Sequence, residues 1–227
     1  MSGILRAEGE WQQAVADALE RTPRPIGYDE RLLPRMPDGS IRPRRPPPAD
    51  AASHARAAAT LLAIYPGAGG ELVVPLTVRR QDLPSHAGEI SLPGGAVDPD
   101  DADEVAAALR EAWEEIGLEP DEVRVAGTLD EVWIPVSNFL LRPVVGTVTR
   151  RPTLVPHDAE VAAVVEMPLA TLFDPSIVGM EEFRSATGGW SVRAGAYRWS
   201  GLRVWGATAL TLGMLARVLG EPSGRER

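Results

Sequence analysis

The amino-acid sequence predicts an α/β sandwich in which a mixed β-sheet lies between helices. Two strand-like apolar runs, 57–66 and 71–80, flank a Gly-rich turn at 67–70. A helical pattern ends at Gly117, further strand-like segments follow, and an amphipathic pattern over 201–219 closes the chain. Strands mixed with few helices, without internal repeats, favour one main core in a chain of 227 residues.

Residues 1–50 are predicted to form an N-terminal helix and a Pro-rich arm. Leu5, Trp11, Val15 and Leu19 recur at roughly helical spacing and predict a short helix over 4–20. The prolines of 22–50 disfavour regular structure, so this segment either wraps the domain or a partner, or is a flexible linker. We expect the main domain over 51–220 and a flexible tail over 221–227.

A long loop over 81–103, rich in Gly, Pro and Asp, separates the second strand from the helix. Loops of this length inside compact domains are often functional. After the helix, 122–149 is predicted to form strand, loop and strand, and 160–173 a strand that enters a short helix. An irregular hairpin is predicted over 179–199.

The helix before Gly117 is bounded by recognisable capping residues. Asp101 or Asp103 is suited to cap its start, and Gly117 is suited to end it in a left-handed conformation. One apolar stripe is predicted to face the core, and the acidic residues are predicted to point outward on nearly the opposite side. The stripe consists of Val105, Leu109, Ala112 and Ile116, and the acidic set of Glu104, Glu111, Glu114 and Glu115.

This acidic cluster is either a solvated helix face or a site for a divalent cation. Glu111 and Glu115 repel each other at a spacing of four residues. Glu114 and Glu115 also lie near the helix C-terminus, where the macrodipole disfavours negative charge. Hard oxygen ligands around Mg²⁺ would offset that cost. Arg110 is placed to pair with Glu114 and to orient a carboxylate.

The composition excludes several kinds of chemistry. The chain has no cysteine and no lysine, which removes zinc–thiolate sites, catalytic thiols and Schiff-base lysines. A formal net charge of −9 disfavours nucleic acid and anionic membranes as partners. Without a membrane-spanning run or a signal-peptide pattern, the expected location is cytoplasmic.

The segment "REAWEEIGL" resembles the second half of the Nudix box. The family pattern is Gly, five residues, Glu, seven residues, then Arg-Glu-apolar-x-Glu-Glu-x-Gly-apolar. The second half is matched throughout, by Arg110, Glu111, Ala112, Glu114, Glu115, Gly117 and Leu118. The first half differs, because the position of its Glu falls on Ala102 and Gly95 lies one residue too far upstream. Asp101, Asp103 or Glu104 is a candidate to replace that Glu.

The extra residue between Gly95 and Arg110 reads as a one-residue insertion in the box. In this form the segment is similar to the Nudix branch that hydrolyses coenzyme A and its thioesters. In that branch Leu-x-x-His-x-Gly-Glu precedes Pro-Gly-Gly, and Asp-Pro-x-Asp follows. The matching residues are Leu83, His86, Gly88, Glu89, Pro93, Gly94, Gly95, Asp98, Pro99 and Asp101. The looser resemblance extends from about Ala57 to Leu219, so it implies a Nudix α/β/α sandwich but does not cover the arm.

The resemblance implies metal-dependent hydrolysis of a diphosphate. Mg²⁺ or Mn²⁺ would be held by Glu111, Glu114 and Glu115, with a backbone carbonyl of Gly94 or Gly95 as a further ligand. The ion would neutralise the diphosphate and activate a water for attack on phosphorus. The general base is either a box glutamate or a downstream carboxylate. Glu160 is the downstream candidate, and Asp130 and Glu131 are further ones, although a solvated or turn role explains all three as well.

Further residues are candidates for substrate contact. Arg79 and Arg80 end a strand ahead of the signature loop and suit the 3′-phosphate of coenzyme A, or else are solvated strand-end charges. His86 has no second histidine at ligand spacing, so a substrate contact or a loop hydrogen bond is favoured over a metal. Two weaker candidates are Arg150 and Arg151, and Trp113 is expected to serve in packing.

These observations favour hydrolysis of coenzyme A or acyl-coenzyme A to 3′,5′-ADP and a 4′-phosphopantetheine. Two alternatives stay open. One is a Nudix pyrophosphatase for another nucleoside diphosphate derivative, such as ADP-ribose or a dinucleotide. The other is a Nudix-like module that binds a nucleotide without cleaving it. A homodimer is plausible, because the Pro-rich arm and the apolar C-terminal helix are suitable contact surfaces.

Overall fold

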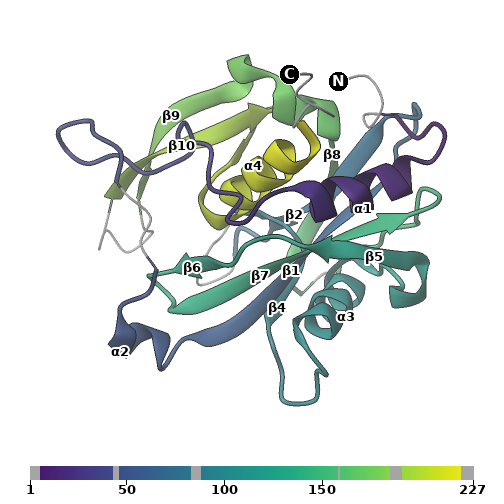
Figure 1. Ribbon diagram of the computed structural model, residues 1–227, viewed down its shortest axis with the longest axis horizontal. Helices are drawn as coiled ribbons and strands as arrows, with labels where there is room; N and C mark the ends of the chain where they lie inside the picture. The colour runs from purple at the N-terminus through teal and green to yellow at the C-terminus, as the bar shows by residue number, and fades with distance from the viewer. Residues whose placement is uncertain (1–5, 43–45, 83–87, 158, 185–190, 221–227) are drawn as a thin grey trace.

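The computed structural model describes residues 6–42, 46–82, 88–157, 159–184 and 191–220. A mixed eight-stranded sheet forms its centre, with helices on both faces, and a three-stranded antiparallel sheet lies to one side (Figure 1). The predicted α/β/α sandwich with a mixed sheet is therefore confirmed.

The central sheet is built around one parallel pair of strands. β1 (Arg56–Pro66) runs parallel to β7 (Phe139–Val148) over nine residue pairs, from Arg56–Phe139 to Ile64–Thr147. The other neighbours are antiparallel and extend the sheet on either side. They are β2 (Leu72–Arg79), β3 (Ile90–Ser91), β4 (Gly94–Ala96), β5 (Val123–Thr128), β6 (Val132–Ile134) and β8 (Val161–Pro168).

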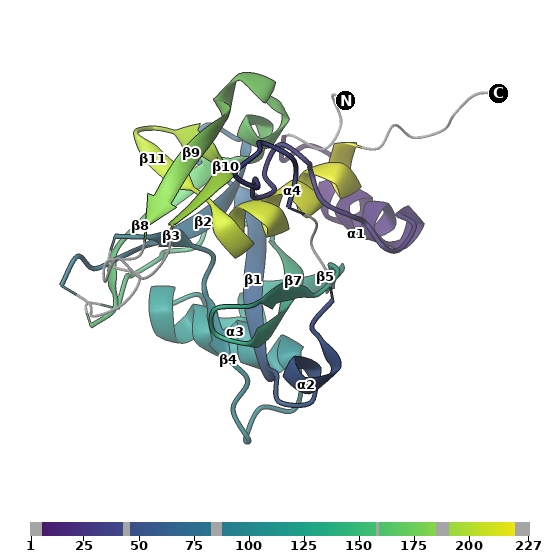
Figure 2. The same ribbon diagram turned by 90° about the vertical axis from the view of Figure 1, so that its left-hand side faces the viewer.

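β1 is buried on both faces, which explains why its sequence is apolar at almost every position. Leu61 and Tyr65 pack towards α3 (Glu104–Ile116) on one face of the sheet. Leu62 and Ile64 pack on the opposite face, which is covered by α1 (Trp11–Arg21) and α4 (Gly206–Gly220) (Figures 1 and 2). The two faces give the sandwich two apolar cores.

The N-terminal arm packs onto the α4 side of the sheet. Trp11, Val15 and Leu19 of α1 are buried there, together with Ile26 and Leu32 of the Pro-rich segment. α1 begins at Trp11, so the helix is shorter at its start than the sequence predicts, and Leu5 lies outside the described residues. The arm covers the chain's own core over most of its described length.

Asp130 anchors the arm to the loop between β5 and β6. Its carboxylate accepts a hydrogen bond from Nη1 of Arg24 at 2.8 Å and another from the backbone N–H of Ile26 at 2.5 Å. Further along, the backbone N–H of Arg35 donates to the carbonyl of Arg193 at 2.7 Å, which ties the arm to the small sheet. A short helix, α2 (Ala49–Ala52), then leads into β1.

The segment before α4 is a strand rather than the start of the helix. Residues 201–219 are predicted as one helix, yet β11 (Leu202–Val204) pairs with β10 (Ser191–Trp199), and α4 begins only at Gly206. β10 also pairs with β9 (Val178–Arg184), which confirms the predicted hairpin in its described part. α4 is buried over most of its circumference, so its apolar face is broader than an amphipathic stripe.

The loop predicted over 81–103 contains two short strands. β3 pairs with β2, and β4 pairs with β1 through Ala58–Ala96, Ala59–Gly95 and Thr60–Gly94. β4 therefore fixes the Gly-Gly pair against the centre of the sheet. The described helices include none that is long and apolar enough to span a membrane. The tail over 221–227 lies outside the described residues.

Candidate active site

The acidic helix α3 has well-defined ends. Asp103 caps its start, because its carboxylate accepts a hydrogen bond from the backbone N–H of Ala106 at 2.8 Å. Gly117 follows its last residue with a φ of 68°, a left-handed conformation that glycine adopts without steric cost. Both caps were predicted, and Asp103 is the one of the two candidate aspartates that serves.

Glu115 does not point outward as predicted. Its side chain is buried, with 8% of the residue exposed, because β4 passes beside the last turns of α3. The backbone N–H of Gly94 donates to Oε2 of Glu115 at 3.2 Å. A helical wheel considers the helix alone and cannot include this crossing strand. The prediction of an outward acidic face is therefore wrong for Glu115, whereas Glu114 is exposed.

Burial raises the pKa of Glu115 to about 7. The hydrogen bond from Gly94 and the nearby charge of Arg79 lower this pKa, while the charges of Glu111 and Glu160 raise it. A buried carboxylate beside other carboxylates is stabilised in its charged form by a cation. This environment distinguishes Glu115 from an ordinary solvated glutamate.

Glu111 lies one turn before Glu115 and contacts the same strand. A β-carbon built on Gly95 would lie 2.5 Å from Oε1 of Glu111, so only glycine leaves room for this carboxylate. Burial raises the pKa of Glu111, and the hydrogen bond from Arg110 lowers it. β4 thus brings Gly94 next to one carboxylate and Gly95 next to the other.

Arg110 organises the acidic groups around it. Its guanidinium forms two hydrogen bonds of 2.9 Å with the carboxylate of Asp101, which is almost fully buried. It also donates to Glu111 at 3.0 Å, to Glu114 at 3.4 Å and to the carbonyl of Ala96 at 3.1 Å. Asp101 is therefore the candidate that meets the box arginine, whereas Asp103 caps the helix.

The donors in this site are of the chemical type that a hard divalent cation prefers. Glu111, Glu114 and Glu115 supply carboxylate oxygens from two successive turns of one helix, the ligand type that Mg²⁺ and Mn²⁺ prefer. The space left by the absent side chain of Gly95 receives the carboxylate of Glu111 beside β4. Within the described ranges, no three acidic side chains are arranged as a coordination shell, and Arg110 bonds to two of the trio instead.

Glu160 lies beside the same end of α3. The segment before β8 is tied to the helix, because the backbone N–H groups of Val155 and His157 donate to the carbonyls of Ile116 and Glu115, each at 2.9 Å. Oε2 of Glu160 is 3.4 Å from Nη2 of Arg79. The carboxylate is largely exposed, so solvent reaches it. The structure thus brings Arg79 and Glu160 together near Glu115.

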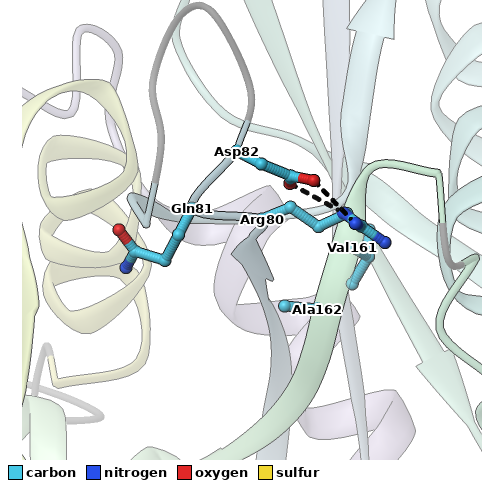
Figure 3. Close-up of a pocket in the computed structure, with 5 residues that line it drawn as sticks. All are labelled: Arg80, Gln81, Asp82, Val161 and Ala162. Carbon is cyan, nitrogen blue, oxygen red and sulfur yellow. Dashed lines mark hydrogen bonds and ion pairs between the residues drawn. The ribbon is translucent and has the colours of Figure 1, made fainter.

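Arg80 lines an open hollow of about 380 Å³ at the end of β2, together with Gln81, Asp82, Val161 and Ala162 (Figure 3). Its guanidinium donates to both carboxylate oxygens of Asp82, at 2.8 and 2.7 Å, so the predicted phosphate ligand is engaged in an ion pair. His86 lies outside the described residues.

Three of the remaining candidates, Asp130, Glu131 and Arg151, have structural partners. Asp130 anchors the arm, and Glu131 pairs with Arg142 at 2.6 Å. Arg151 forms two hydrogen bonds with Glu166 of β8, at 3.0 and 2.7 Å, and Arg150 is exposed. Trp113 is half exposed on α3.

A second cavity was not predicted from the sequence. It has a volume of about 230 Å³ and lies on the α4 side of β4, opposite the acidic helix. Its lining combines β4 with apolar residues of β6 and β7 and with the first turns of α4. Gly94 and Gly95 belong to the signature segment, whereas the lining residues of β6, β7 and α4 are distant from it in sequence and form no motif, so no sequence signal identifies them.

The NUDIX domain family model matches residues 54–185 of the chain. "Nudix hydrolase 15, mitochondrial" of Arabidopsis thaliana is 37% identical over 149 residues, covering 63% of this chain and 47% of the relative. "Uncharacterized Nudix hydrolase NudL" of Cronobacter sakazakii is 50% identical over 98 residues, covering 42% of this chain and 49% of the relative. The chain thus spans about half the length of these curated relatives.

Among solved structures, the chain resembles a Nudix hydrolase from M. smegmatis, RenU. The TM-score is 0.44 at 22% identity, covering 65% of this chain and 83% of that one. A C. elegans Ap4A hydrolase binary complex gives a TM-score of 0.42 at 18% identity, covering 50% and 80%.

Proposed function

The chain belongs to the NUDIX domain family, and on this basis we propose that it hydrolyses the diphosphate bond of coenzyme A or an acyl-coenzyme A. The products are 3′,5′-ADP and the corresponding 4′-phosphopantetheine. The observation that carries the hydrolytic part of this proposal is the placement of Glu111 and Glu115 of α3 against Gly94 and Gly95 of β4. A family box with its second half complete and its carboxylates held in place supports a catalytic role over passive binding.

Glu111, Glu114 and Glu115 are the residues proposed to hold Mg²⁺ or Mn²⁺. When bound, such an ion neutralises the diphosphate and lowers the pKa of a coordinated water. Arg110 acts as a positioning residue, because its guanidinium fixes the carboxylate of Glu111. The carboxylate of Asp101 in turn fixes the guanidinium of Arg110. The burial of Glu115 keeps bulk water from screening charge at this point.

Glu160 is proposed as the general base that accepts a proton from the attacking water. It stands on the loop that is hydrogen-bonded to the C-terminal end of α3, which holds it near the carboxylates. Its ion pair with Arg79 orients the carboxylate and leaves it accessible. The rival assignment is a glutamate of the box itself.

The substrate assignment rests on the segment from Leu83 to Asp101, which resembles the coenzyme A branch of the family. In this proposal Arg79, Arg80 and His86 meet the phosphorylated nucleoside, and the backbone of Gly94 and Gly95 meets the diphosphate. Arg80 would exchange its partner Asp82 for a phosphate. A guanidinium donates two parallel hydrogen bonds to a phosphate in the same geometry as to a carboxylate.

A substrate panel with Mg²⁺ or Mn²⁺ tests the assignment. Coenzyme A, acetyl-coenzyme A, ADP-ribose and a dinucleoside diphosphate are incubated with the protein, and products are separated by chromatography. We expect release of 3′,5′-ADP from the two coenzyme A compounds. Turnover of ADP-ribose without turnover of coenzyme A would establish the alternative pyrophosphatase. Nucleotide binding without any hydrolysis would establish a binding module.

A homodimer is a separate proposal, testable by light scattering. The two segments that suggested it, the arm and α4, both pack against the chain's own core. A dimer contact made by these segments would use residues outside that core.

A further inference from the structure

The cavity on the α4 side of β4 has an uncharged lining. Its walls include Leu92, Ile134, Phe139 and Leu141, and none of its described lining residues carries a formal charge. Such a pocket suits a neutral, mostly aliphatic group and disfavours a phosphate, since a charge buried there would lack a counter-ion.

One buried hydroxyl in this lining has no partner. Thr211 of α4 is fully buried, and its Oγ1 has no hydrogen-bond partner among the described residues. Two other polar side chains of the lining are satisfied: Thr60 donates to the carbonyl of Pro93 at 2.7 Å, and Ser91 is bonded to Thr77 at 2.8 Å. Buried hydroxyls without partners are rare, so Thr211 points to a ligand that supplies one.

The pocket and the acidic helix share one strand. Gly94 and Gly95 contact Glu115 and Glu111, and the same two glycines line the cavity. A substrate whose diphosphate meets the carboxylates therefore has its neighbouring group within reach of this cavity.

The lining is better suited to an aliphatic chain than to a nucleobase. Bases are bound largely by stacking on aromatic faces. The single aromatic residue of the described lining is Phe139, and the guanidinium of Arg56 already lies 4.1 Å from its ring centroid. The basic residues Arg79 and Arg80 lie elsewhere, at the end of β2 beside Glu160, where a phosphorylated nucleoside finds counter-charge.

We propose that this cavity receives the pantetheine arm of the substrate, an uncharged aliphatic chain with amides, and that the hydroxyl of Thr211 hydrogen-bonds to one of those amides. The nucleoside half then extends towards Arg79 and Arg80. This inference rests on the proposed hydrolysis of coenzyme A and adds the direction in which the substrate lies across β4.

Binding of the two products, measured separately by calorimetry with Mg²⁺, tests this direction. Ala207→Phe fills the cavity from the first turn of α4, and Thr211→Val removes the hydroxyl at constant shape. We expect the Kd of 4′-phosphopantetheine to rise about tenfold or more in Ala207→Phe, since a bulky group excludes the ligand. In Thr211→Val the Kd of 4′-phosphopantetheine should rise about threefold to tenfold, because one hydrogen bond to the ligand is lost. The Kd of 3′,5′-ADP should not change in either variant.

Ala14→Phe on α1 is the matched control for the added bulk, because Ala14 is half-buried on a helix and does not line the cavity. Thermal unfolding reports folding, and Thr211→Val should not lose stability because it breaks no hydrogen bond of the protein. Unchanged binding of 4′-phosphopantetheine, or weaker binding of 3′,5′-ADP in either variant, would overturn the inference. Either of these results would leave the proposed function standing, provided that the wild-type protein cleaves coenzyme A. A wild type that cleaves only ADP-ribose would refute the proposed function itself, and the pantetheine assignment with it.

Discussion

The carboxylate of Glu111 lies so close to Gly95 that a β-carbon built there would come within 2.7 Å of both carboxylate oxygens. Gly95→Ala should therefore displace the carboxylate without disturbing the sheet, because the end of a flexible side chain yields more readily than backbone. We expect kcat to fall about a hundredfold, the effect of misplacing a reacting group by about 1 Å. Steady-state kinetics and thermal unfolding measure both parts of this prediction.

Gly69→Ala is a matched control for this substitution. A β-carbon at Gly69 would also press on a glutamate carboxylate, with Oε2 of Glu71 at 2.6 Å, but in the turn between β1 and β2. The kcat of Gly69→Ala should equal that of wild type. Equal loss of activity in the two variants would contradict a specific role for the contact between Gly95 and Glu111.

Asp101 holds Arg110, and Arg110 holds Glu111. Asp101→Asn should loosen this chain of contacts and lower kcat or metal affinity about tenfold to a hundredfold, as is usual for groups that orient metal ligands. Asp98→Asn provides the comparison, because Asp98 is largely exposed and its carboxylate lies 3.8 Å from the guanidinium. A metal titration of both variants should show weaker binding only for Asp101→Asn, and identical titrations would argue against the positioning role.

Glu160→Gln tests the assignment of the general base. Removing a base from the attacking water should lower kcat about 10²-fold to 10⁴-fold with a smaller change in KM. Glu119→Gln, an exposed glutamate just after α3, serves as the control. If Glu160→Gln retains wild-type kcat, the base is one of the box glutamates.

The arm should contribute to the stability of the fold rather than to catalysis. Trp11 is 6% exposed in the core that also contains α4, so Trp11→Ala should lower the free energy of unfolding by about 3–5 kcal/mol. Chemical denaturation measures this loss, and kcat at low temperature should stay at the wild-type value. An unchanged unfolding curve would mean that the arm folds independently of the domain.

The sequence was sufficient for the features that depend on local order. The caps of α3 depend on neighbouring backbone alone, so the sequence identifies Gly117 at its end and narrows the start to Asp101 or Asp103, of which Asp103 caps the helix. The long apolar run of β1 likewise identifies a buried strand without reference to the rest of the chain.

The parts that failed depend on contacts between distant segments. Glu115 is buried because β4 passes beside α3, and β4 itself is three residues long with two glycines, too short for any strand pattern. α4 starts later than predicted because Leu202–Val204 pairs with β10. Thr211 became a candidate only once the fold placed it in a cavity beside Gly94.

The rate of 3′,5′-ADP release from coenzyme A, measured with Mg²⁺ for wild type, Glu114→Gln and Glu115→Gln, tests the central claim most directly. The account predicts steady release by wild type and a rate at least about a hundredfold lower in each variant, because each variant loses a carboxylate ligand of the metal ion. Circular dichroism should show all three proteins folded. Near-wild-type release by both variants would contradict the claim that these carboxylates form the metal-binding centre.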